Sequence, residues 1–256
     1  MSAAASVRLL GLDFAALSLE AAAQAIERRP AGAPFRYVVT PNADHLVRLA
    51  RQPALRPLYA DAALCLLDSR VVAGFAHLIG LPTPPVVAGS DLTARLVARL
   101  PREERVVVIG LRAQAVRALA ARRRLAPPHH YDPPMGFETD PDAFARTVDF
   151  IGAHPARLIF LAVGSPRQEM LAAALARTAG ITGTALCIGA SLHYLAGAAR
   201  RAPVWMRRAN LEWLHRLAAD PNRLARRYLR DDPAIFALLL RERLRLGIGL
   251  DAPAGL

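Results

Sequence analysis

Short apolar runs alternate with longer amphipathic stretches along the first 190 residues of the chain. The stretches repeat their apolar residues every three or four positions, as in "SLEAAAQAIERR" and "PDAFARTVDFIGAH", and predict helices. The runs are apolar throughout, which is typical of strands buried on both faces of a parallel sheet. We therefore expect an α/β doubly wound domain with strands at residues 7–12, 37–40, 63–67, 105–109, 158–163 and 185–188.

The pattern changes at about residue 200, where the strand-like runs end and a basic helical segment begins. We divide the chain into an α/β domain, residues 1–198, and a helical C-terminal appendage, residues 199–256. From Arg200 to Arg245 the appendage carries twelve arginines and five acidic residues. Its apolar stretch at residues 233–246 is too short to span a membrane and suits a helix lying at a membrane surface. A helix packed on the core or on a second subunit is the alternative.

Composition adds a strong positive charge to this picture. The chain is 54% hydrophobic, which supports a large core, and its formal net charge is +12 with arginine as its only basic residue apart from histidine. Such a surface predicts a phosphate-bearing partner, whether nucleotide, lipid or nucleic acid. Cys65 and Cys187 lie in apolar runs and are expected to be buried thiols. The sequence indicates neither a signal peptide nor a membrane-spanning segment.

Four of the predicted strands end in polar turns. In an open parallel sheet such turns meet at one edge, where free backbone N–H groups are available to a ligand. The turns lie at residues 40–45, 68–70, 110–112 and 164–169.

The turn within "FLAVGSPRQEM" has two interpretations. Ser165, Pro166 and Gln168 form an S-x-x-Q pattern with proline at the first helical position, which is a helix-capping signature. Alternatively, Gly164 lets a ligand approach the backbone, the helix start binds an anion, and Gln168 and Glu169 hydrogen-bond to a sugar.

Asp68 follows an apolar run, and a partly desolvated carboxylate at that edge could serve as a general base. Capping of a helix that begins near Arg70 is the alternative. Thr40 and Asn42 are candidates for the same site, although a Pro-Asn pair after a strand is also ordinary turn chemistry.

Several short motifs argue against metal or dinucleotide binding. Asp140-Pro141-Asp142 is formally a D-x-D pattern, but its proline favours a helix cap. His129 and His130 lack the spacing of a zinc site. The chain contains neither G-x-G-x-x-G nor a P-loop, which argues against a nucleotide-sugar oxidoreductase or epimerase. An RNA-binding aromatic motif is also missing from the sequence.

Longer motifs carry a resemblance to a known family. The blocks "VVTPNADHLVRLA", "LLDSRVV", "AGSDL", "PPMGF", "FLAVGSPRQEM" and "RAPVWMRRANLEWLHRLAADPNRLARRY" resemble the WecG/TagA/CpsF glycosyltransferases over about residues 8–230. The resemblance implies a Rossmann-like α/β domain and a membrane-docking appendage that helps to complete the active site. It also implies inverting transfer from a UDP-sugar to a polyprenyl-diphosphate-linked saccharide during exopolysaccharide or cell-surface polymer synthesis, without a metal or other cofactor.

By position, the resemblance assigns roles to residues of this chain. The expected catalytic residues are Asp68, which is the base, Thr40 and Asn42. The expected donor-binding residues are Ser90, Gly110, Gly136, Gly164, Arg167, Gln168, Glu169 and His193. The arginines expected to meet the acceptor or the membrane are Arg200, Arg201, Arg207, Arg208, Arg226 and Arg227.

Three positions depart from the family's usual pattern. Ser69 stands where glycine usually follows the catalytic aspartate, and His193 stands where an aspartate is common. Val86 or Val87 stands where an arginine usually precedes "G-S-D-L". The last two changes fall at expected pocket positions and bear on the donor sugar and on activity itself. A non-catalytic or altered-donor descendant of the family is therefore an alternative.

We expect a cytoplasmic protein that is peripheral on the inner face of the cytoplasmic membrane. Its expected partners are a UDP-sugar, a lipid-linked acceptor and anionic lipid, with no nucleic acid and with homo-oligomer formation left open. Without a metal, backbone N–H groups and arginines must stabilise the departing UDP. A basic nucleic-acid-binding protein is the remaining alternative.

Overall fold

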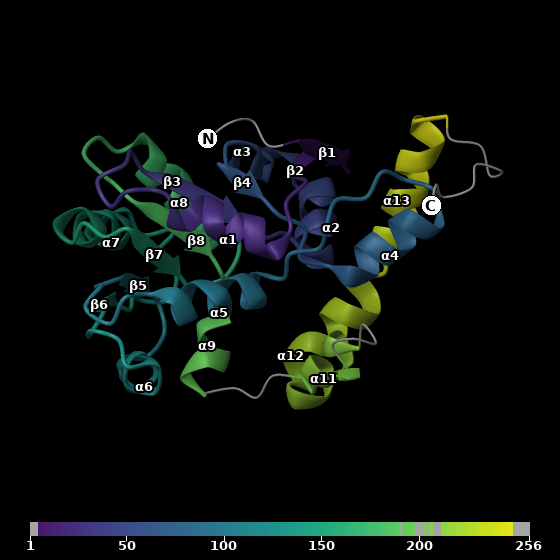
Figure 1. Cartoon of the computed structure of the whole chain (residues 1–256). Coiled ribbons are helices and arrows are strands. Elements are labelled where there is room, and N and C mark those ends of the chain that lie inside the picture. The colour runs from purple at the N-terminus through teal and green to yellow at the C-terminus, as the bar shows by residue number, and fades with distance from the viewer. Residues whose placement is uncertain (1–4, 190, 198–201, 204, 207–210, 248–256) are drawn as a thin grey trace.

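The computed structural model describes residues 5–189, 191–197, 202–203, 205–206 and 211–247 (Figure 1). Its centre is a sheet of six parallel strands in the order β4-β3-β8-β7-β5-β6. The strands are β3 (Arg36–Val39), β4 (Leu64–Cys65), β5 (Val107–Ile109), β6 (His129–Tyr131), β7 (Leu158–Leu161) and β8 (Thr184–Cys187). Three of the four inner strands, β5, β7 and β8, are buried at every residue, which confirms the parallel α/β fold read from their apolar runs.

Helices cover both faces of this sheet, and each face has its own hydrophobic core. One core joins the sheet to α2 (Ala43–Arg51), α3 (Pro57–Ala60), α4 (Arg70–Leu78), α7 (Pro141–Ala153) and α8 (Arg167–Arg177). The other joins it to α1 (Leu19–Glu27), α5 (Gly89–Arg99), α6 (Ala113–Arg123) and α9 (Ser191–Ala196). The doubly wound arrangement follows from this division, because successive strand residues such as Val38 and Val39 point into opposite cores.

The predicted strand at residues 7–12 is wrong, because this segment forms the turn of an antiparallel hairpin. Its strands are β1 (Ser6–Leu9) and β2 (Leu12–Ala15). Leu10 and Gly11 connect them with φ angles of 51° and 79°, the left-handed pair that a two-residue hairpin turn requires. The apolar run concealed the turn because a leucine occupies a position where asparagine or glycine is usual.

The sheet also contains one strand that the sequence reading missed. β6 pairs with β5 in parallel at the edge of the sheet, between prolines and with no apolar run. All three residues of β6 are only half-buried, so this strand needs less apolar character than the central strands.

The C-terminal appendage is helical, as predicted. It contains α11 (Glu212–Ala219), α12 (Pro221–Arg226), the π-helical turn η2 (Arg227–Asp231) and α13 (Ala234–Arg245), and it lies beside α4 in Figure 1. The expectation that the helix at residues 233–246 lies at a membrane surface needs correction for one face of α13. Ile235 and Leu239 are fully buried in the same core as α2 and α4, so this face packs on the α/β domain.

Three further expectations concern membrane spans, the domain boundary and the cysteines. None of the helices described here is long and apolar enough to cross a membrane. The division at residues 198 and 199 falls outside the described residues and stays a prediction. Cys65 and Cys187 are free and buried, as expected from their apolar neighbours.

Candidate active site

The polar turns that follow the strands lie along one edge of the sheet. Because all six strands are parallel, Asp68 after β4, Thr40 after β3, Gly164 after β7 and Gly110 after β5 share the carboxyl edge. Asp68 and Gly164 are three strand positions apart, which corresponds to roughly 14 Å at the usual strand spacing. The aspartate and the glycine-led turn therefore lie at the same edge of the sheet.

Gly110 and Gly164 flank the point where the winding of the sheet reverses. After β5 the chain enters α6 on one face, and after the neighbouring β7 it enters α8 on the other. Both glycines are left-handed, with φ angles of 87° and 82°. A Cβ on Gly110 would lie 3.0 Å from the carbonyl of Ala162, so the backbones approach too closely for a side chain. Such a reversal is the usual place for a nucleotide in a doubly wound sheet.

Asp68 sits in a mostly buried position at this edge. Its Oδ2 accepts a hydrogen bond of 2.9 Å from the Gly89 N–H. Burial raises the pKa of Asp68 to about 7, against the opposing effects of that N–H and of the Arg216 guanidinium. The capping alternative is wrong, because Ser69 is the N-cap of α4 and its Oγ accepts from the Val72 N–H. The carboxyl of Asp68 instead binds the N–H of Gly89, the first residue of α5, so it stabilises the start of α5 and not that of α4.

Thr40 lies against the same carboxyl group across Gly89. A Cβ on Gly89 would come within 2.5 Å of Thr40 Oγ1 and 3.3 Å of Asp68 Oδ2. The absence of a side chain at Gly89 therefore lets the threonine hydroxyl and the carboxyl crowd together at the start of α5.

A cavity of about 360 Å³ opens in front of Asp68, between the α/β domain and the appendage. The α/β domain contributes Asn42, Ala43, Asp68, Ser69, Arg70, Val71, Val86, Ala88 and Ser90. The appendage contributes Glu212, Trp213, Arg216, Arg227, Tyr228, Asp232, Pro233, Ile235 and Phe236. The appendage therefore forms one wall of the site.

Arg216 is one of the cavity residues that the sequence did not single out. Its Nη2 donates to Glu212 Oε1 at 2.9 Å, and its guanidinium lies 5.5 Å from the centre of the Tyr194 ring. It stands in the "LEWLHRL" stretch, where it looked like one more arginine of a basic helix. Only the packing of the appendage shows that this one faces the aspartate.

Asn42 both starts α2 and contacts the appendage. Its Oδ1 accepts from the His45 N–H at 3.4 Å, and His45 Nδ1 accepts from the Asn42 N–H at 3.0 Å. Burial lowers the pKa of His45 to about 3, so the ring is neutral and can accept. Arg227 of the appendage donates to Asn42 Oδ1 at 3.3 Å. The turn-forming interpretation of Asn42 is confirmed, with a second role in holding the appendage.

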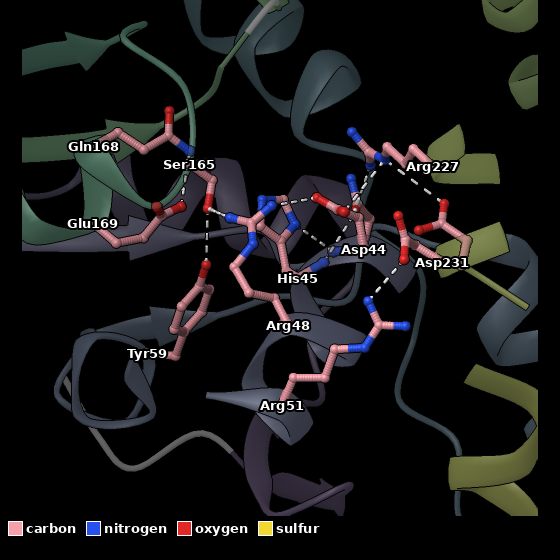
Figure 2. Close-up of polar contacts among 12 residues, drawn as sticks. Asp44, His45, Arg48, Arg51, Tyr59, Ser165, Gln168, Glu169, Arg227 and Asp231 are labelled. Atoms are coloured by element: carbon pink, nitrogen blue, oxygen red, sulfur yellow. Dashed lines mark hydrogen bonds and ion pairs between the residues drawn. The ribbon is translucent and has the colours of Figure 1, made fainter. Parts of the chain in front are cut away.

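A polar network joins the turn after β7 to α2 and the appendage (Figure 2). Arg48 donates to Ser165 Oγ at 3.0 Å and to Asp44 Oδ2 at 2.6 Å. Tyr59 Oη lies 3.2 Å from the same serine hydroxyl. On the other side, Asp44 Oδ1 is 3.6 Å from Arg227 Nε. The network engages the hydroxyl of Ser165 with side chains and not with a backbone N–H of α8.

The capping-box interpretation of this turn is therefore wrong. The N-cap of α8 is Pro166, with no side-chain hydrogen bond, and Gln168 points elsewhere. Gln168 Nε2 donates to Glu169 Oε1 at 2.8 Å, and its Oε1 accepts from the Gly189 N–H at 2.9 Å. Gln168 and Glu169 are 3% and 2% exposed, and burial raises the pKa of Glu169. Gln168 therefore binds the backbone of both turns, at Gly164 and at Gly189, and Glu169 holds the Gln168 side chain in place.

The remaining expected donor residues lie around the crevice. Gly136 is left-handed in the loop after β6, and Arg167 reaches across to Met135 in that loop at 3.8 Å. Ser90 is buried at the start of α5, where it lines the cavity. His193 is half-buried on α9, and burial lowers its pKa.

The expected acceptor arginines are only partly covered by the structure. Arg200, Arg201, Arg207 and Arg208 lie outside the described residues. Arg226 pairs loosely with Asp231 at 3.9 Å, and Arg227 belongs to the network already described.

Two of the departures from the family pattern, at Ser69 and at Val86 or Val87, lie at or near the cavity. Val86 lines the cavity, whereas Val87 is 1% exposed and packs in the core of the opposite face. Val86 is therefore the valine that faces a ligand. Ser69 caps α4, which gives the residue after Asp68 a structural use.

The metal-like motifs have structural explanations. Asp140 caps α7, with its Oδ1 accepting from the N–H groups of Asp142 and Ala143. His130 Nε2 bonds the carbonyls of Gly110 and Leu111. Within the described part of the chain, His, Cys, Asp and Glu residues form no group of three that could hold a metal. That no cofactor is needed stays a prediction.

Comparison with known proteins agrees with the resemblance. A curated relative from Bacillus spizizenii strain W23 is 26% identical over 212 residues, which cover 81% of this chain and 80% of the relative. It is described as an N-acetylglucosaminyldiphosphoundecaprenol N-acetyl-beta-D-mannosaminyltransferase. Residues 7–248 match the glycosyl transferase WecG/TagA/CpsF family, nearly the whole length of the sequence. The chain therefore belongs to the WecG/TagA/CpsF family of glycosyltransferases.

Proposed function

We propose that the protein transfers a sugar from a UDP-sugar to a polyprenyl-diphosphate-linked saccharide, with inversion at the anomeric carbon. The family and the acceptor named for the relative support the lipid-linked substrate. The product would serve in exopolysaccharide or other cell-surface polymer synthesis. The observation that carries the proposal is a buried carboxyl with a pKa of about 7, facing a cavity closed by the appendage.

The donor diphosphate would lie over the left-handed glycines at the winding reversal. Gly110 and Gly164 carry no side chain that would keep a diphosphate away from the backbone, and Arg167 brings a cation beside Gly164. These groups would stabilise the charge on UDP as it departs, which is the task of a metal in other transferases. Gln168 and Glu169 would hold the surrounding turns in shape.

Asp68 would take the proton of the attacking acceptor hydroxyl. The oxygen would then form a bond to the anomeric carbon from the face opposite UDP, while the bond from that carbon to the UDP oxygen breaks. A base is most effective when its pKa is near the working pH, and burial has moved Asp68 to that range. Thr40 and Asn42 would orient the acceptor or the carboxyl, since both border the same edge.

The departures bear on which sugar is transferred. Val86 supplies an apolar wall to the cavity, and His193 is held neutral by burial near the donor edge. An altered donor is therefore the first variation to test, and a non-catalytic descendant is the second.

The same proposal places the protein on the cytoplasmic face of the membrane as a peripheral protein. UDP-sugars are made in the cytoplasm, and the lipid-linked acceptor lies in the membrane. The arginines and exposed apolar residues of the appendage would contact anionic lipid.

A two-step experiment tests the function. A thermal-shift panel of UDP-sugars identifies the donor through the stabilisation that a bound ligand confers. Each stabilising donor is then offered with a polyprenyl-diphosphate-linked sugar, and transfer is followed by mass spectrometry. Stabilisation without transfer to any lipid-linked sugar would favour the non-catalytic alternative, and the lack of both would remove the proposal.

A further inference from the structure

An apolar surface leads away from the cavity along α4 and α13. Val71 of α4 and Phe236 of α13 both line the cavity. Phe75, one turn further along α4, packs edge-on against Phe236 with ring centroids 4.8 Å apart. Arg243 donates to the carbonyl of Ile79, so the helices stay in contact as far as the end of α4. The contacts advance together along both helices, which therefore run in the same direction.

Exposed apolar side chains continue this contact on both helices. On α4, Leu78 follows Phe75 by three residues and is 76% exposed. On α13, Leu240 and Leu244 follow Phe236 at intervals of four and are 45% and 77% exposed. Residues three and four apart share one side of a helix, so each set forms a stripe. The two stripes meet where Phe75 contacts Phe236, and together they extend the cavity into an exposed apolar strip.

Arg70 stands between the cavity and this strip. It is the first residue of α4, two positions after Asp68, and it lines the cavity while remaining exposed. It forms no hydrogen bond or ion pair with any residue that the structure describes. Its guanidinium is therefore available to a ligand at the mouth of the site.

The other two arginines of the cavity are held by carboxylates. Arg216 pairs with Glu212 at 2.9 Å, and Arg227 lies 3.7 Å from Asp232. A doubly charged phosphate group entering the cavity would have to compete for these two cations. Arg70 needs no such exchange, so it is the first cation that a diphosphate would meet.

We propose that α4 binds the lipid-diphosphate portion of the acceptor, with Arg70 on the diphosphate and the α4–α13 strip on the first isoprenoid units. The inference rests on the proposed function, because it takes the acceptor sugar to lie at Asp68. The order of groups along α4 matches the order of groups in such an acceptor: sugar, diphosphate and apolar chain. From Arg70 to Leu78 the helix rises about 12 Å, enough for the start of the chain.

Binding of two small probes tests this assignment without any transfer reaction. Farnesyl diphosphate carries three isoprenoid units and isopentenyl diphosphate carries one, so the pair separates the tail from the head group. Isothermal titration of the full chain should show at least tenfold tighter binding of the farnesyl probe. Leu78→Ser combined with Leu240→Ser should remove most of that difference and leave isopentenyl diphosphate unaffected. Arg70→Gln should weaken both probes about tenfold, and Arg70→Lys should restore part of the loss.

Two control variants test whether the loss of any exposed apolar or basic side chain changes probe binding. Leu229→Ser removes an exposed leucine of the appendage that lies outside the strip, and Arg117→Gln removes an exposed arginine on α6. Neither should change the binding of either probe. Equal affinities for the two probes in the unmodified protein would overturn the tail assignment. Unchanged binding in Arg70→Gln, or equal losses in Arg117→Gln, would overturn the diphosphate assignment.

The outcome is separable from that of the proposed function. Transfer to a lipid-linked sugar with no discrimination between the probes would leave the function standing and reject the strip. Conversely, discrimination that depends on Leu78 and Arg70, in a protein that transfers no sugar, would support the strip while rejecting catalysis.

Discussion

Asp68 combines burial with a position at the wall of the cavity, which is the arrangement expected of a general base. We expect Asp68→Asn to lower kcat by about 10²–10⁴-fold, the usual contribution of general-base catalysis. Donor affinity, measured by thermal shift, should not change, because the carboxyl is three strands away from the donor turn. Asp140→Asn is the matched control, since asparagine also caps a helix. A loss of less than a few-fold in Asp68→Asn would exclude this residue as the base.

The pKa of Asp68 predicts how the rate depends on pH. A general base must be deprotonated to act, and burial has raised the pKa of this carboxyl to about 7. The value of kcat/KM should therefore rise tenfold for each pH unit below 7 and level off above about 8. Rates measured from pH 5 to pH 9 with a saturating donor check this. A flat profile down to pH 5 would mean that a carboxyl with an ordinary pKa, or no carboxyl, removes the proton.

At the residue scale, the sequence identified those site residues whose position next to a strand or turn already suggests a function. Asp68 stands out because it is a carboxylate directly after an apolar strand. Arg216 does not stand out, because its neighbours along the helix are equally basic. Its role depends on the approach of two segments that are 148 positions apart in the chain, which no local pattern encodes. The burial of Gln168 and Glu169 was missed for the same reason.

At the scale of elements, α13 divides into a buried face and an exposed face at adjacent residues. Leu239 is fully buried in the core shared with α2 and α4, whereas Leu240 is 45% exposed. We expect Leu239→Ala to lower the free energy of unfolding by about 2–5 kcal/mol, the range for leucines truncated in a core. Leu240→Ala should cost less than about 1 kcal/mol, since nearly half of its surface is already in water. Urea unfolding of both variants compares the same leucine-to-alanine change at a buried and at an exposed position. Equal losses would mean that α13 does not pack on the core as described.

The elements also show where sequence patterns are reliable. Long apolar or amphipathic stretches, such as those of β7 and α7, appear where they were expected. Local hydrogen bonding was less predictable. Ser165 has the sequence of an N-cap, but Arg48 and Tyr59 hold its hydroxyl, so tertiary contacts replace the local one. Capping is worth about 1 kcal/mol, which a charged partner can outweigh.

At the scale of the whole molecule, the appendage forms one wall of the cavity at Asp68 and also carries a large part of the positive charge. The cavity takes roughly half its lining from each part, so neither part alone contains the site. The sequence predicted both parts and the charge of the second. It left open whether α13 packs on the core or lies on a membrane, because apolar residues suited to a lipid surface are equally suited to a protein core.

The net charge of +12 leaves two candidate surfaces for the protein, an anionic membrane and a nucleic acid. We expect the protein to sediment with vesicles containing anionic lipid more strongly than with neutral vesicles, because exposed arginines on α13 stand beside exposed leucines. Each arginine near an anionic surface contributes about 1 kcal/mol, so Arg241→Gln with Arg245→Gln should weaken vesicle binding roughly thirtyfold. Arg117→Gln with Arg123→Gln removes the same charge from α6 and should have a much smaller effect, since that helix lies away from the appendage (Figure 1).

Duplex DNA offers phosphates but no apolar phase, so binding to DNA should be lost at salt concentrations that leave part of the vesicle binding intact. Stronger retention on DNA than on vesicles, or equal losses in the two double variants, would mean that overall charge alone directs the protein, and the peripheral membrane assignment would fail.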